Sequence, residues 1–149
     1  MRNFLWLLGV LGCIAAAARF QPNAPYGSVR SDVSVSWQEW DERGPTFTFC
    51  ADGSGVHSRQ TTGETEAKVL GLVKEDVPGS KAAALHARLR KEVEVALEEP
   101  CRGGKTRELT LREGSRTWTI EIGTYAGPAQ AHIIEIMEGE LGELRGAKF

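Results

Sequence analysis

The stretch SKAAALHARLRKEVEVALEE, residues 80–99, contains the longest helical pattern in the sequence and divides the chain into two strand-rich parts. One side of this pattern carries apolar residues at the spacing that lines a single helix face: Ala82, Leu85, Leu89, Val93 and Ala96 or Leu97. Lysine, arginine and glutamate occupy the opposite side. We therefore expect a surface helix packed on a sheet, with Ser80 as its N-cap and Pro100–Cys101 beyond its end.

Short alternating segments precede this helix and are typical of antiparallel strands. They are residues 31–37, 46–50, 56–62 and 67–74. Asp52-Gly53 supplies a tight hairpin turn between the second and third segments. The third segment, VHSRQTT, is polar and is expected to be exposed or at an edge, whereas the fourth, AKVLGLVK, is expected to be a central strand. Together they predict a meander of three or four strands.

A hairpin and a second helix follow. Residues 107–113 and 116–123 alternate on either side of Gly114-Ser115, and Pro128 suits the first turn of a helix. Its expected apolar stripe is Ile133, Ile134, Met137, Leu141 and Leu144. Gly139 and Gly142 predict that its last turns fray.

The expected fold is α+β: an antiparallel sheet, built from the meander and the C-terminal hairpin, with two amphipathic helices on one face. It forms one domain over residues 31–146.

Composition excludes several classes of protein. The chain has 149 residues, of which 41% are hydrophobic and 26% charged, so wholesale disorder and a polytopic membrane protein are both excluded. Its 18 basic and 20 acidic residues give a net charge of −2 with interspersed signs. No basic patch is present for nucleic acid or an anionic membrane surface.

The first 18 residues have the layout of a secretory signal peptide: a positive start, an apolar segment at residues 4–14 and small residues before a cleavage site near Ala17 or Ala18. We expect an exported protein, periplasmic or extracellular, with residues 19–30 as a flexible lead-in and no membrane span after cleavage. In one alternative, residues 10–13 (VLGC) form a lipobox, and lipidated Cys13 anchors the protein in the envelope. In another, the segment stays uncleaved as an anchor.

Export determines how the cysteines are interpreted. Removal of residues 1–18 leaves Cys50 and Cys101, and two cysteines in an oxidising compartment predict a disulfide. Closing a loop of about 50 residues would stabilise the fold by about 4 kcal/mol in the chain-entropy model. The alternative is two buried free thiols. Neither cysteine has a second ligand at close spacing, so no metal site is expected.

Few residues qualify as binding or catalytic candidates. Trp37 and Trp40 either form a stacking platform, for example for a glycan, or cover a small core, and Trp40 beside the turn is the more exposed candidate. His57 lies near Asp52 and Ser54, which permits a local catalytic triad, although a hairpin turn accounts for that run more simply. Trp40 and His57 are therefore the candidate ligand surface. His86 and His132 are expected to be solvated, and no cofactor, metal or catalytic residue is assigned.

The order of elements resembles one protein family. An alternating meander with an Asp-Gly turn, a helix, the hairpin LTLREGSRTWTIEI at residues 109–122 and a short C-terminal helix are similar to the emfourins. The resemblance covers residues 33–144 and includes the cadence L-x-L-x-[DE]-G at residues 109–114. Emfourins are small bacterial proteins that inhibit thermolysin-like metalloproteases, so the resemblance implies a protease inhibitor. It carries no inhibitory residue onto this sequence.

These observations favour a small exported binding or interaction domain without catalytic activity. Its expected partner is a protein or another component of the cell envelope, and not a nucleic acid. The alternatives are an exported, emfourin-like protease inhibitor and an enzyme of unrecognised type, because a fold alone does not determine function.

Overall fold

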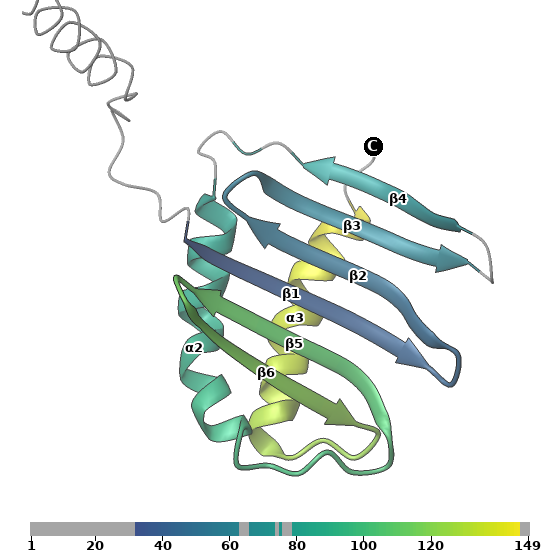
Figure 1. Ribbon diagram of the computed structural model, residues 1–149, viewed down its shortest axis with the longest axis vertical. Helices are drawn as coiled ribbons and strands as arrows, with labels where there is room; N and C mark the ends of the chain where they lie inside the picture. Colours follow the sequence, from purple (N-terminus) through teal and green to yellow (C-terminus); the bar gives the residue numbers. More distant parts are fainter. Residues whose placement is uncertain (1–31, 63–65, 74, 76–78, 147–149) are drawn as a thin grey trace, which may run out of the picture.

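A computed structural model describes residues 32–62, 66–73, 75 and 79–146. The expected signal peptide at 1–18, with Cys13, and the lead-in at 19–30 lie outside the described residues. The elements, in chain order, are β1 (Val33–Asp41), β2 (Gly44–Asp52), β3 (Gly55–Thr62), β4 (Glu66–Val73), α2 (Ser80–Ala96), β5 (Lys105–Glu113), β6 (Arg116–Gly123) and α3 (Pro128–Gly146). Figure 1 shows the strands as one sheet.

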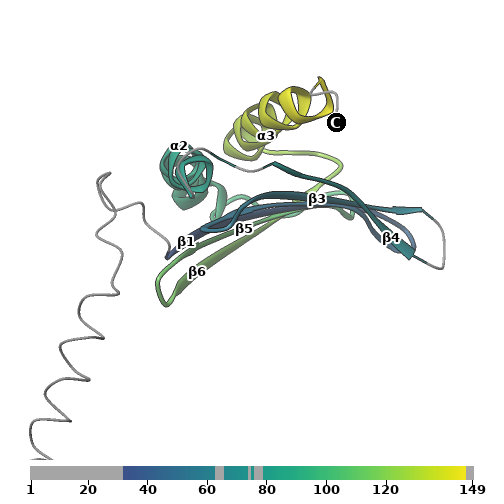
Figure 2. The ribbon, with the colours of Figure 1, turned by 90° about the horizontal axis from the view of Figure 1, so that it is seen from above.

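All six strands form a single antiparallel sheet in the order β4-β3-β2-β1-β5-β6. Both helices lie on the same face of this sheet, as the view along its edge shows (Figure 2). The expected α+β fold is therefore confirmed, including the contribution of the meander and the hairpin to one sheet. The C-terminal hairpin joins the meander through β5, which pairs with β1.

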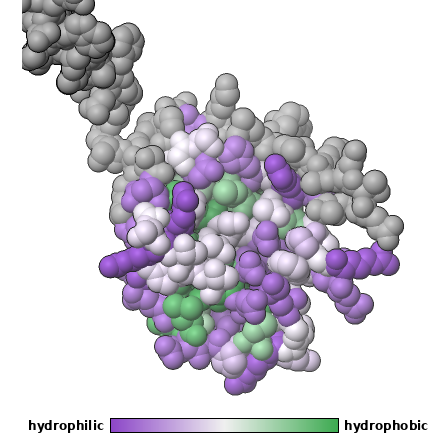
Figure 3. All heavy atoms as spheres, viewed as in Figure 1, coloured by the Kyte–Doolittle hydropathy of each residue, from purple (hydrophilic) through white to green (hydrophobic). Residues whose placement is uncertain are grey.

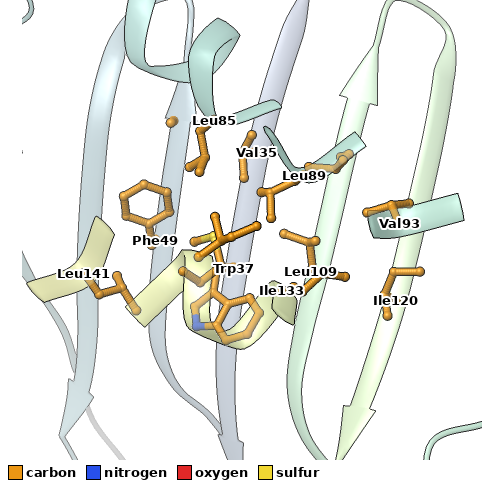
Figure 4. Close-up of a cluster of buried hydrophobic side chains, with 14 of the residues drawn as sticks. Val35, Trp37, Phe49, Leu85, Leu89, Val93, Leu109, Ile120, Ile133 and Leu141 are labelled. Atoms are coloured by element: carbon orange, nitrogen blue, oxygen red, sulfur yellow. The ribbon is translucent and has the colours of Figure 1, made fainter. Parts of the chain in front are cut away.

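The core lies between the sheet and the two helices (Figure 4). From β1, Trp37 is fully buried beneath the helices, while Leu89 and Val93 of α2 cover β5 and β6. Ile133 of α3 closes the same core. The predicted stripe of α2 is buried throughout: Ala82, Leu85, Leu89, Val93 and Ala96. Apolar burial at helical spacing therefore fixes which side of each helix meets the sheet.

Strands β1, β2, β3 and β5 are longer than their alternating patterns predicted, β6 has the predicted bounds, and two strands lie elsewhere in the sheet than expected. β1 continues past Trp37 to Asp41, with a bulge between Glu39 and Trp40. β4, expected to be central, is an edge strand, and the polar β3 lies between β4 and β2. Backbone pairing does not depend on hydrophobicity, so a polar strand can be internal when its outer face meets solvent.

The start of α2 differs from the prediction. Ser80 is already helical, and the N-cap is Gly79, whose φ of 79° suits glycine. The carboxylate of Glu75 accepts the amides of Gly79 and Lys81 at 2.8 and 2.7 Å. A glutamate before the helix thus performs the capping expected of Ser80. The helix ends at Ala96, three residues before the predicted end at Glu99.

The second helix, α3, continues through both internal glycines to Gly146, so the expected fraying at Gly139 and Gly142 was wrong. Its N-terminus is held by Glu99, whose two carboxylate oxygens accept the amides of Ala129 and Gln130, each at 2.9 Å. An anionic group at this end also complements the helix dipole. No helix within the described ranges is long and apolar enough to cross a membrane.

The expected disulfide is absent, because Cys50 and Cys101 are both free thiols. Cys50 is on β2 and opposite Ser36 of β1, whereas Cys101 lies near β6 in the segment after α2. Strands β2 and β6 are three positions apart in the sheet, about 14 Å at the usual strand spacing. A disulfide requires Cα atoms within about 7 Å, so the fold separates the two cysteines.

Candidate functional site

The face of the sheet turned away from the two helices is not covered by any other element of the described structure (Figure 2). We call it the helix-free face, made of the outward side chains of β1, β2, β3, β5 and β6. Along β1 the buried residues Val33, Val35 and Trp37 alternate with half-exposed ones, and the latter belong to this face. Figure 3 views it directly and shows mainly hydrophilic and intermediate residues, with small, separate hydrophobic areas.

The centre of the helix-free face carries no formally charged side chain. The strand registers place one outward residue from each of these five strands in a single row across the sheet: His57, Cys50, Ser36, Thr110 and Thr119. The hydroxyls of Thr110 and Thr119 lie 3.4 Å apart. Short hydroxyl and thiol side chains therefore form the middle of this surface.

One end of the face carries a cation–π cluster. Lys105 Nζ lies 3.7 Å from the centroid of the Trp40 ring, 3.0 Å from Glu108 Oε2 and 3.6 Å from Glu121 Oε1. The hydrogen bond to Glu108 raises the pKa of Lys105, which favours the charged form of the ammonium group. Trp40 is half-buried, and this ammonium group covers one side of its ring. A planar ligand therefore has only the remaining part of the Trp40 ring to contact.

The other end of the face carries a polar cluster around the β2–β3 turn. Asp52 Oδ1 accepts hydrogen bonds from the hydroxyl and the amide of Ser54, at 2.6 and 2.7 Å. His57 Nε2 lies 2.9 Å from Ser54 Oγ. Burial raises the pKa of Asp52, but the hydrogen bonds from Ser54 and the proximity of His57 outweigh it, so the pKa is lower than the ordinary value. For Cys50, burial and then the Asp52 carboxylate raise the pKa of the thiol.

This cluster does not have the geometry of a catalytic triad. In a triad the histidine accepts the serine proton at one ring nitrogen, and the aspartate holds the other. Here Asp52 Oδ1 accepts the hydrogen bond of the Ser54 hydroxyl. It lies 3.8 Å from His57 Nε2, which is the same ring nitrogen that faces Ser54. The hydrogen bonds among these three residues therefore stabilise the tight β2–β3 turn.

The structure places both predicted ligand residues, Trp40 and His57, on the helix-free face but does not bring them together. His57 belongs to the central row through its pairing with Cys50, which is opposite Ser36. Trp40 follows Ser36 by four residues, about 13 Å along a strand. The two side chains therefore lie at separate places on this surface.

On the opposite side of the molecule, a groove between α2 and α3 has a volume of about 410 Å³. It is lined by Ala87, Arg88, Lys91, Glu92, His132 and Ile136. Ion pairs occupy its walls: His132 Nδ1 lies 3.1 Å from Glu92, and Arg88 binds Glu140 at 2.8 Å. His132 is exposed, as predicted. Because Arg88, Glu92 and His132 are engaged in these ion pairs, the groove serves to join the two helices.

His86 is not solvated as expected, since only 5% of it is exposed. Its ring meets the edge of Trp118 with centroids 6.4 Å apart, and the Arg90 guanidinium lies 4.1 Å over the same indole. Trp118 comes from β6, more than 30 positions along the chain. Charged and small neighbours in the sequence therefore gave no signal of this burial.

Among the residues that the structure describes, no group of three or more His, Cys, Asp or Glu side chains is arranged to hold a metal ion. Comparison with protein-family models and with curated proteins finds no match to this chain.

Proposed function

We propose that this protein is a small exported, non-catalytic binding domain that presents the helix-free face to a protein or another envelope component. The observation that carries the proposal is the distribution of charge on that face. The middle row, with Ser36 and Thr110 at its centre, is formally uncharged. Glu108 and Arg112 flank Thr110 in the next rows along β5, and Lys105 lies at the start of that strand. Interfaces between proteins typically have a core depleted of charged residues and a polar rim.

Substitution at the centre of the face tests this proposal. Ser36→Arg places a long cation in the uncharged row, between Cys50 and Thr110. Ala84→Arg, on the exposed side of α2, is the matched control. We expect the immobilised protein to retain a specific envelope component, and Ser36→Arg, but not Ala84→Arg, to abolish retention. Circular dichroism and thermal melts establish that both variants fold. Equal retention by all three proteins would exclude the helix-free face as the binding surface.

A second candidate function is inhibition of thermolysin-like metalloproteases. It is supported by the order of elements from β1 to α3, which is the order on which the resemblance to emfourins depends. An inhibitor of this kind suppresses protease activity at near-equimolar amounts. A titration across a panel of metalloproteases measures this directly, and the absence of any suppression would eliminate inhibition while leaving the binding function intact.

Export is the third part of the proposal and is supported by the layout of residues 1–18. Intact mass of the processed protein distinguishes the three fates of this segment. Cleavage near Ala17 or Ala18 removes the expected signal peptide, whereas a lipid-modified mass beginning at Cys13 indicates an envelope anchor. A full-length mass indicates an uncleaved segment.

A further inference from the structure

The free edge of β6 combines an open strand with an adjacent hollow of mixed polar and apolar lining. β6 is the last strand of the sheet, and its pairing with β5 is regular from Glu113–Arg116 to Leu109–Ile120. Counted from the two-residue turn, the alternation of an antiparallel ladder directs the main chain of Thr117, Thr119 and Glu121 away from β5. Edge strands usually carry lysine, proline or a bulge that blocks pairing, and β6 has none of these between Thr117 and Ile122.

The hollow lies between this edge and the end of α2, and its volume is about 360 Å³. It is lined by Ala96, Leu97, Glu99, Cys101, Thr119, Ile120 and Glu121. Two large hydrophobic residues are exposed at the C-terminal end of α2: Val95, which is 59% exposed, and the C-cap residue Leu97, which is 48% exposed. A strand added to β6 would therefore place a helix-side residue beside Ile120 and Leu97.

We propose that β6 pairs antiparallel with β6 of a second copy of this chain, about a two-fold axis at Thr119, so that two sheets become one. This interface uses the main-chain edge of β6, whose outward residue Thr119 also belongs to the helix-free face. It does not depend on the proposed binding function. In this register Thr119 is opposite its own counterpart, and Trp118 of one copy is opposite Ile120 of the other. The indole of Trp118, which packs against Arg90 of its own copy, would then lie beside Ile120 of the other copy. An aromatic residue opposite a β-branched one is a favourable cross-strand pair.

Charge selects this register over its neighbours. It places Glu121 opposite Thr117 of the other copy, whose partner on β5 is Arg112, so that an exposed carboxylate and an exposed guanidinium lie on the same face with one strand between them. A two-residue slip that centres the axis on Ile120 would place the two Glu121 carboxylates diagonally adjacent. The opposite slip would place Arg116 against Ile120. Self-complementarity of this kind is what a two-fold dimer requires.

The oligomeric state of the full chain, purified as the cell processes it, tests the proposal. We expect sedimentation equilibrium to give twice the mass of one chain for the wild type and for Thr119→Val, which keeps the shape and strand preference of Thr119. Thr119→Lys places like charges directly opposite each other and should give the mass of one chain. A monomeric wild type, or a dimer that persists in Thr119→Lys, would overturn the proposal.

Cross-linking tests the register itself. In a Cys50→Ser/Cys101→Ser background, Thr119→Cys should form a covalent dimer under mild oxidation, because directly opposed residues have Cα atoms about 5.5 Å apart. Thr117→Cys is the matched control, since its counterpart in this register is four residues away along the strand. Cross-linking of both variants to the same extent would contradict a two-fold axis at Thr119.

Discussion

Glu99 and Gln130 form two hydrogen bonds that join the segment after α2 to the start of α3. The Gln130 amide donates to Glu99 Oε2 at 2.9 Å, and Gln130 Nε2 donates to the Glu99 carbonyl oxygen at 3.1 Å. The Gln130 side-chain oxygen in turn accepts the amide of Gly127 at 3.2 Å. The α2–β5 connection and the first turn of α3 are therefore one hydrogen-bonded unit.

Removal of the Glu99 carboxylate should destabilise the protein. Glu99→Ala leaves the amides of Ala129 and Gln130 without their acceptor, and we expect a loss of about 1–2 kcal/mol in the free energy of unfolding. Glu98→Ala, at the exposed neighbouring position, is the control and should change stability by less than about 0.5 kcal/mol. Urea denaturation measures both, and equal losses would contradict the capping role.

The carboxylate of Glu140 should contribute more to the free energy of unfolding than that of the nearby Glu143. Glu140 is 9% exposed and lies 2.7 Å from Lys81 Nζ and 2.8 Å from Arg88 Nη1, whereas the Glu143 side chain is 73% exposed. We expect Glu140→Gln to lower the free energy of unfolding by about 1–2 kcal/mol and Glu143→Gln by less than about 0.5 kcal/mol. Denaturant titration at low and high salt separates the two. Similar losses in both variants would show that burial of Glu140 adds nothing.

Acid should weaken the β2–β3 turn through Asp52. The pKa of Asp52 in the folded protein is below the ordinary value. Its contribution to folding stability is therefore present above the unfolded pKa and is lost as the pH falls through the folded pKa. Below about pH 4 we expect the wild type to lose denaturant resistance more steeply than Asp52→Asn, which keeps the Asn-Gly turn preference but has no proton to bind. Parallel acid-dependence curves for the two proteins would contradict this role for the carboxylate.

The two thiols should react at different rates. Cys101 is exposed, whereas Cys50 is half-buried and its thiol pKa is raised, which lowers the fraction of reactive thiolate. We expect alkylation near pH 8 to modify Cys101 first, as followed by mass spectrometry of the single-cysteine variants Cys50→Ser and Cys101→Ser. An unreduced protein that takes up no alkylating group at either cysteine would indicate a disulfide and contradict the fold described above.

The sequence predicted the elements whose signal is local. The apolar spacing of Leu85, Leu89 and Val93 located α2 and its buried face, and alternation around Gly114 located the β5–β6 hairpin. Gly114, with φ of 59°, has the conformation that a hairpin turn of this kind requires at its first central position.

Features that depend on distant contacts were not predicted. The capping role of Glu99 has no local signal, because its partners, the amides of α3, lie about 30 residues later. His86 is covered by Trp118, also from a later strand. The disulfide between Cys50 and Cys101 was predicted from their even number and the expected export, and only the strand order reveals their separation.

The position of β1 inside the sheet has a consequence for the order of folding. β1 is the first strand in the described chain, yet one of its two neighbours is β5, which begins only at Lys105. As the chain emerges during synthesis, β1 to β4 can pair early, but the other edge of β1 stays open, with Trp37 beneath an incomplete helical cover. Such edges promote aggregation. A chain that ends near Pro100 should therefore be far more prone to aggregate than one that includes β5 and β6.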